Sequence, residues 1–83
     1  MNSVLVGGNP CFNPETIEIK IGDTILWSWI AGTHTVTAYD KSYDSDLISN
    51  MDHKPIFRHT FIEIGIYPYY CRLHGMSGTV IVK

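Results

Sequence analysis

Alternating apolar and polar residues predict a series of short β-strands along this chain. In Thr16–Ile21 the isoleucines alternate with charged residues, which is the two-residue period of a strand with one apolar face. A Gly-Asp pair follows and predicts a turn. Thr24–Ile30 then alternates again, with both tryptophans on one face, where we expect them to enter the core. These two runs predict consecutive strands.

Alternating apolar and polar residues, or an enrichment in β-branched residues, also occur in segments on either side of these two runs. Five further strands are predicted: Val4–Val6, His34–Tyr39, Phe57–Ile62, Ile66–Cys71 and Thr79–Lys83. The long connection Asp40–Pro55 is polar and has no sustained helical stripe, and a short turn of helix over Leu47–Met51 is the one helical expectation. About seven short strands imply an all-β fold, an antiparallel sandwich or barrel.

The parity of residues within Ile66–Cys71 predicts which of its side chains face the core. Tyr67, Tyr69 and Cys71 share one parity and are expected to point inward, whereas Pro68 and Tyr70 point outward. Proline is tolerable there only where no neighbouring strand needs its amide. The thiol of Cys71 is thus expected at the end of a strand, facing inward.

Length and charge narrow the range of functions. The 83 residues suffice for one small domain, predicted over residues 1–83. Six Lys and Arg against eight Asp and Glu give a net charge of −2, so no basic field favours nucleic acid. No apolar run approaches the roughly 18 residues of a spanning helix, so membrane insertion is not expected.

The two cysteines allow two interpretations. Cys11 and Cys71 could form one bridge across most of the chain, or at least one thiol could serve chemistry. If Cys71 binds a metal, Cys11 is left as a small buried side chain.

The segment from Cys71 to Met76 gathers three kinds of metal donor within six positions. Cys71 offers a thiolate, His74 an imidazole and Met76 a thioether. Thiolate and imidazole suit zinc or copper, but thioether sulfur is a weak axial ligand typical of copper sites. No second CxxC or HxxxH accompanies the segment, which disfavours structural zinc.

A trigonal His₂Cys site requires a second imidazole from elsewhere in the chain. His34, His53 and His59 are the candidates. His34 is preferred because its strand could pass beside Cys71. His59 is the second choice, and His53 lies in the polar connection.

Motifs in a constant order extend through nearly the whole chain. In chain order they are FxPxxIxIxxGDTxxW from Phe12, GTHTVT from Gly32, TF at Thr60, and GxYxYYCxxHxMxGTVxV from Gly65. This order resembles the cupredoxins, small blue copper proteins of the plastocyanin and amicyanin kind.

The resemblance implies a Greek-key β-sandwich of about seven to eight strands with one copper ion at one end. Matching positions imply His34, Cys71, His74 and Met76 as metal ligands. Thr35 falls where the family often has an asparagine that ties the two ligand loops together.

The loop departs from the family pattern at one point. Family members usually have two or more residues between the second histidine and the methionine, whereas here only Gly75 separates His74 from Met76. Glycine can adopt backbone angles closed to other residues and so permits a tighter turn. The shorter loop predicts that Met76 either contacts the metal at an unusual distance or angle or misses the metal.

The expected function is one-electron transfer by copper cycling between Cu(I) and Cu(II), without substrate chemistry, so no enzyme is expected. No nucleophile-elbow motif supports hydrolysis. Expected partners are redox proteins that bind transiently to a monomer. The alternative is an extracytosolic copper carrier or copper-resistance protein, and a third hypothesis is a module of a larger oxidase. The family implies a periplasmic or otherwise extracytosolic location.

Overall fold

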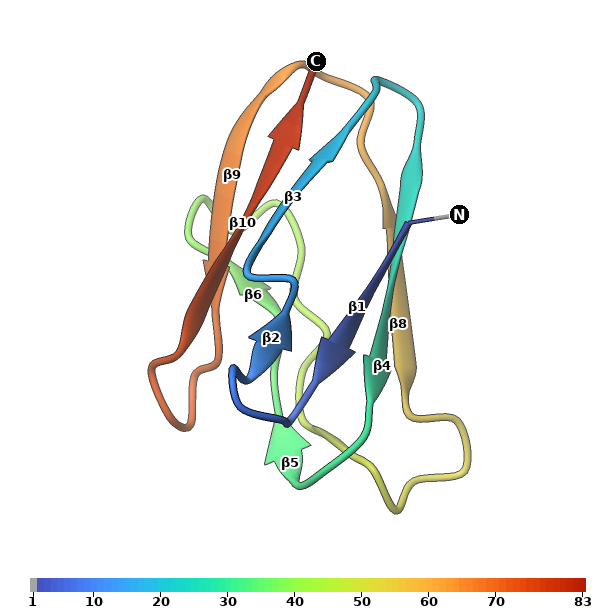
Figure 1. Cartoon of the computed structure of the whole chain (residues 1–83), viewed down its shortest axis with the longest axis vertical. Coiled ribbons are helices and arrows are strands. Elements are labelled where there is room, and N and C mark those ends of the chain that lie inside the picture. Colours follow the sequence, from blue (N-terminus) through green and yellow to red (C-terminus); the bar gives the residue numbers. More distant parts are fainter. Residues whose placement is uncertain (1) are drawn as a thin grey trace.

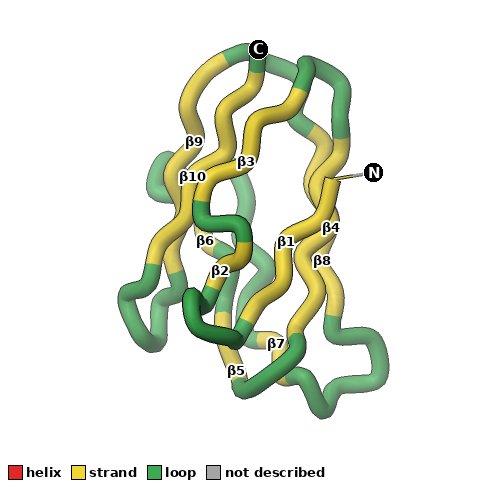
Figure 2. Tube along the Cα trace, viewed as in Figure 1, coloured by secondary structure: helices red, strands yellow, loops and turns green. Residues whose placement is uncertain are grey.

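The computed structural model describes residues 2–83 as a protein of β-strands and loops (Figure 2). Within those residues no helix occurs, and so none that is long and apolar enough to cross a membrane. The strands are β1 (Asn2–Val6), β2 (Phe12–Asn13), β3 (Thr16–Ile19), β4 (Thr24–Trp29), β5 (Thr33–His34), β6 (Thr37–Ala38), β7 (Ile48–Ser49), β8 (Ile56–Thr60), β9 (Gly65–Tyr70) and β10 (Ser77–Val82).

Two four-stranded sheets face one another and form a sandwich (Figure 1). One sheet has the order β2-β1-β4-β8, the other β3-β10-β9-β6, and β5 pairs with β7 separately. The all-β sandwich is confirmed, but the expectation of purely antiparallel pairing is wrong, because β1 pairs with β4 and β3 with β10 in parallel. Between β1 and β4 the chain crosses to the opposite sheet, and such a crossover allows neighbouring strands to run parallel.

The segment after β4 differs from the sequence-based expectation. The predicted strand His34–Tyr39 divides into β5 and β6, which belong to different sheets. Thr35 and Val36 are both buried, which breaks the alternation of a single strand. The helical turn expected over Leu47–Met51 is also wrong, because residues there form β7 and pair with β5.

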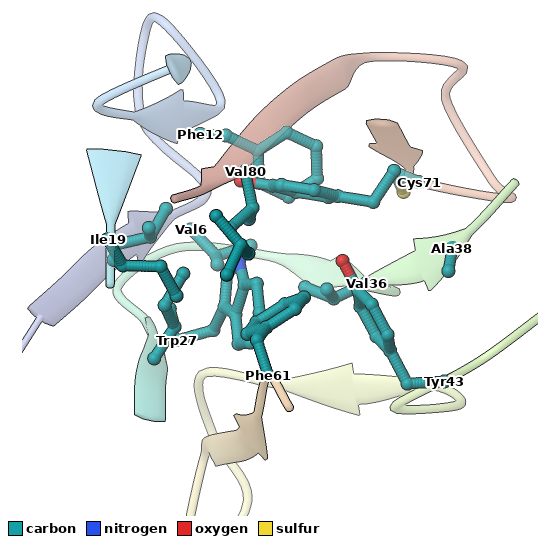
Figure 3. Packing of buried hydrophobic residues seen from close by; sticks show 14 of the residues in the cluster. Val6, Phe12, Ile19, Trp27, Val36, Ala38, Tyr43, Phe61, Cys71 and Val80 are labelled. Atoms are coloured by element: carbon teal, nitrogen blue, oxygen red, sulfur yellow. The ribbon is translucent and has the colours of Figure 1, made fainter. Parts of the chain in front are cut away.

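Aromatic rings fill the space between the sheets (Figure 3). Tyr69 makes edge contacts with Trp27 at 5.6 Å and with Phe12 at 4.8 Å between ring centroids. Trp29 and Tyr69 are buried as predicted, whereas Tyr67 is only partly buried and donates a hydrogen bond to the Glu63 carbonyl at 2.9 Å. Such edge-to-face contacts stabilise a small core beyond the apolar area that they bury.

The sandwich has one end where several loops meet. In Figure 1, β5, the loop before β2 and the connection from β9 to β10 all lie at the lower end, and the C-terminus lies at the upper end. In Figure 3, Cys71 lies at one side of the packed core and Ile19 at the opposite side. The loop-rich end therefore carries the residues with metal-binding chemistry.

Candidate metal centre

Three potential metal donors from two separate segments converge at the loop-rich end. The ligand atoms of His34, Cys71 and His74 all lie within 4.8 Å of one another. The sulfur of Cys71 is 3.8 Å from Nδ1 of His34 and 3.5 Å from Nδ1 of His74. His53 is exposed in the long connection, and His59 stacks on Tyr43, so neither belongs to this cluster.

The turn before β5 sets the orientation of the His34 ring. Gly32 has a φ of 74° and makes two hydrogen bonds of 3.1 Å with Asn50. The Gly32 amide donates to Oδ1 of Asn50, and the Asn50 amide donates to the Gly32 carbonyl. Nε2 of His34 lies 3.0 Å from the Ala31 carbonyl, which can only accept a hydrogen bond, so Nε2 carries the proton. In the neutral ring Nδ1 is therefore unprotonated, and it faces the Cys71 sulfur.

The electrostatic environment of His34 favours a neutral ring. Burial lowers the pKa of His34, the nearby His74 lowers it further, and the hydrogen bond to the Ala31 carbonyl opposes these effects. A metal binds only the neutral imidazole. The ring is thus in the protonation state that a ligand requires.

The loop after β9 presents the other two donors. The Cys71 amide donates to the Met76 carbonyl at 2.8 Å, and the Gly75 amide donates to the Cys71 carbonyl at 2.9 Å. Gly75 has a φ of 78°, as the tight loop requires. Cys71 is fully buried, whereas His74 is exposed. This closed loop holds a buried sulfur beside a solvent-accessible imidazole.

Met76 follows immediately in the same loop. Its side chain is partly buried and packs against the hydrophobic core. A thioether in such a position fills space whether or not it contacts a metal. The expected role of Met76 as an axial ligand stays a prediction.

A buried chain of hydroxyl groups ties the two ligand segments together. The Arg72 amide donates to Oγ1 of Thr35 at 2.8 Å, and Thr35 and Thr37 hydroxyls lie 3.0 Å apart. Thr37 in turn donates to Asp44 at 3.1 Å, so the Thr35 hydroxyl must donate to Thr37. Thr35 thus connects the two ligand segments, at the position where the family often has an asparagine.

The side chain of Arg72 adds a second connection on the surface. Its guanidinium lies 3.5 Å from Asp44 and 2.8 Å from Asp46. All three side chains are substantially exposed, so the ion pairs contribute little to stability. These contacts join two acidic residues of the long connection to the loop that follows β9.

Cys11 lies at the same site, which sequence analysis did not predict. Its sulfur is 3.8 Å from Nδ1 of His34, and both cysteines are free, so no Cys11–Cys71 bridge forms. Burial raises the pKa of the Cys11 thiol, the Gly7 amide opposes this shift, and Cys71 adds to it. Only the position of Cys11 directly before the Phe12 motif could have indicated its proximity.

The donor set fits a copper ion. One buried cysteine sulfur and two imidazoles are the His₂Cys donors of trigonal copper sites, and a thioether is available in the same loop. The hydrogen bond from His34 to Ala31 and the hydroxyl chain from Thr35 supply the outer contacts that orient such ligands.

Comparison with known proteins agrees with this fit. The sequence model of one protein family, the copper-binding proteins of the plastocyanin/azurin family, matches residues 4–83 of this chain. The chain therefore belongs to this family of copper-binding proteins, and the resemblance to cupredoxins is confirmed.

Three solved structures show the same fold. A purple cupredoxin from Nitrosopumilus maritimus has a TM-score of 0.87 at 24% identity, with 100% of both chains covered. Oxidized plastocyanin from Dryopteris crassirhizoma has a TM-score of 0.84 at 23% identity, covering 98% of this chain and 99% of that one. A copper-containing nitrite reductase from Thermus scotoductus has a TM-score of 0.81 at 25% identity, covering 99% of this chain and 22% of that one.

Proposed function

We propose that this protein carries single electrons between redox proteins, using one copper ion bound by His34, Cys71 and His74, with Met76 as a weak axial donor. The observation that supports this proposal is the convergence of three donor atoms within 4.8 Å. Copper in such a site supplies a Cu(I)/Cu(II) couple whose potential depends on the ligands and the contacts around the sulfur.

The protein's own residues limit rearrangement at the site. The Ala31 carbonyl fixes the His34 ring, and Thr35 holds the backbone that follows Cys71. Both segments start from strands of a packed sandwich, whose interior resists deformation. Ligands that keep one arrangement in both oxidation states favour rapid electron transfer.

The exposed His74 is the proposed point of electron entry and exit. Of the three donor residues, His74 is the one whose side chain is exposed, and the adjacent Leu73 is 53% exposed. An apolar residue beside an exposed imidazole suits a small and transient protein contact. We propose that the protein works as a monomer in the periplasm or another extracytosolic compartment.

The proposal is tested by optical and electron paramagnetic resonance spectra of the copper-loaded protein. We expect a strong thiolate-to-copper band that Cys71→Ala abolishes and that the control His53→Ala leaves unchanged. Met76→Ala should shift the spectrum if the thioether contacts copper, and an unchanged spectrum removes Met76 from the ligand set. A Cys71→Ala protein that keeps the band would contradict the site.

Kinetics separate electron transfer from the other functions considered. Fast electron self-exchange with a reversible couple supports a carrier. Transfer of the copper ion itself to an acceptor, with little redox activity, would favour a copper carrier or resistance protein. Co-purification with a larger oxidase would favour the hypothesis that this protein is a module of an enzyme. The match to 22% of a copper-containing nitrite reductase chain is the observation that motivates this test.

A further inference from the structure

The sulfur of Cys11 lies as close to Nδ1 of His34 as the sulfur of Cys71 does. Nδ1 of His34 is 3.8 Å from the sulfur of Cys11 and also 3.8 Å from the sulfur of Cys71. Because Nε2 bears the proton that Ala31 accepts, Nδ1 has one lone pair, directed away from the ring. Two sulfurs within contact of one such nitrogen can share a metal bound to it.

The distance agrees with direct coordination. Bonds of the lengths that zinc makes, about 2.0 Å to imidazole nitrogen and about 2.3 Å to sulfur, span 3.8 Å when the angle between them is about 120°. This angle lies close to trigonal and tetrahedral values. The same arithmetic applied to Cys71 gives the same angle, so the two sulfurs are equivalent in their distance from Nδ1 of His34. Cys71 also lies within 4.8 Å of the His74 donor atom, in a cluster that does not include Cys11.

The backbone around Cys11 is held in place on both sides. The Gly7 amide donates to the Cys11 carbonyl at 2.7 Å, and the next residue, Phe12, pairs with Val6 in the sheet. The Phe12 ring is buried against Tyr69. The Cys11 side chain itself is partly buried against the core. Its sulfur therefore occupies a defined position beside His34.

We propose that Cys11 is a fourth ligand of the metal centre, so that the protein holds its ion with two thiolates and two imidazoles. This inference rests on the proposed copper site of His34, Cys71 and His74. On binding, the Cys11 thiol releases its proton to solvent as the sulfur–metal bond forms, with no change of oxidation state. A second soft sulfur favours Cu(I), and the Cys₂His₂ set also suits zinc.

X-ray absorption of the protein loaded with Cu(I) under reductant counts the short sulfur bonds directly. We expect two sulfurs at about 2.3 Å in the wild type, one in Cys11→Ser and two in Met76→Leu. A single short sulfur in the wild type overturns the inference. A number of short sulfur bonds that falls in Met76→Leu but not in Cys11→Ser also overturns the inference.

Alkylation provides an independent readout that does not depend on electron transfer. Cys11 is only partly buried, so iodoacetamide should modify it in the metal-free protein and fail to modify it once Cu(I) is bound. Intact mass under reductant confirms that both thiols are free before each reaction. Equal modification of Cys11 with and without Cu(I) overturns the inference.

Cu(I) affinity distinguishes failure of this inference from failure of the proposed function. In competition with a chelator, Cys11→Ser should lower Cu(I) affinity by more than the roughly 10- to 100-fold that removal of an outer contact costs, and Cys71→Ala should lower it further. If Cys71→Ala weakens binding and Cys11→Ser does not, only the fourth ligand is wrong. If neither does, the proposed copper site itself is wrong.

Discussion

Two glycines with nearly the same backbone angle have different surroundings at the metal centre. Gly32 has a φ of 74° and Gly75 a φ of 78°. A Cβ at Gly32 would lie 3.0 Å from Nε2 of His34, whereas a Cβ at Gly75 would meet nothing within 4 Å. The pair therefore separates the cost of backbone conformation from the cost of displacing a ligand.

We expect Gly32→Ala and Gly75→Ala each to lower the free energy of unfolding of the metal-free protein by about 1–2 kcal/mol. Only Gly32→Ala should also weaken copper binding, because the added methyl group pushes the His34 ring from its place. Denaturant unfolding and copper titration measure the two effects. Equal copper affinities for both variants would show that the ring accommodates the methyl group.

The hydroxyl of Thr35 serves as both acceptor and donor in a fully buried position. Thr35→Val should lower the free energy of unfolding by about 1–3 kcal/mol, because the Arg72 amide loses its acceptor and Thr37 its donor. Thr35→Ser keeps the hydroxyl and serves as the control. Serine loses only the methyl group, whereas valine keeps that methyl group and loses the hydroxyl. If Thr35→Ser costs more in denaturant unfolding than Thr35→Val, methyl packing and not hydrogen bonding dominates at this position.

At the scale of single elements, β8 contributes a histidine that packs among aromatic rings. His59 stacks on Tyr43 at 4.5 Å and makes an edge contact with Phe61 at 4.8 Å. Burial lowers the pKa of His59, and Asp40 partly opposes this shift. The folded-state pKa lies below the unfolded value of about 6.5, so the unfolded state binds the proton more readily.

This difference predicts that the metal-free protein loses stability as pH falls below about 6.5, with the stability fully present above that pH. His59→Phe keeps an aromatic ring and should reduce the slope of unfolding free energy against pH. The buried His34, whose pKa is also lowered, accounts for a remaining slope. An unchanged slope in His59→Phe would assign the whole effect to other groups.

The elements that could be predicted from sequence are those in which side chains alternate between core and solvent. In β4 the two tryptophans are buried on one face, and in β9 Tyr69 is buried while Pro68 is exposed, as parity indicated. The division between β5 and β6 could not be predicted this way. Thr35 is buried because its hydroxyl has hydrogen-bond partners, and alternation carries no signal of such pairing.

The residues of the candidate metal centre also differ in how far the sequence predicts their positions. Cys71 and His74 are neighbours in one loop, so their proximity is local, and the motif around His34 predicts the proximity to them that the structure shows. The contact of Cys11 with His34 depends on the path of the loop before β2. A loop path set by tertiary contacts leaves no periodic pattern in the sequence.

At the scale of the whole molecule, the metal connects segments that are distant in the chain. Copper at about 100 times its dissociation constant should raise the free energy of unfolding by about 2.7 kcal/mol, because the proposed ligands meet only in the folded state. Denaturant unfolding with and without copper measures this gain. A chelator should reverse it, and Cys71→Ala should not show it; an equal gain in that variant would mean that copper binds elsewhere.

The position of β10 within its sheet has a consequence for the order of folding. It lies between β9 and β3, with Thr79 paired to Thr16, and the loop that presents Cys71 and His74 meets His34 only when segments distant in the chain come together. Contacts between such remote segments form slowly. In a refolding experiment, the appearance of copper colour should therefore follow the completion of the sheet, and copper should report the end of folding rather than initiate it.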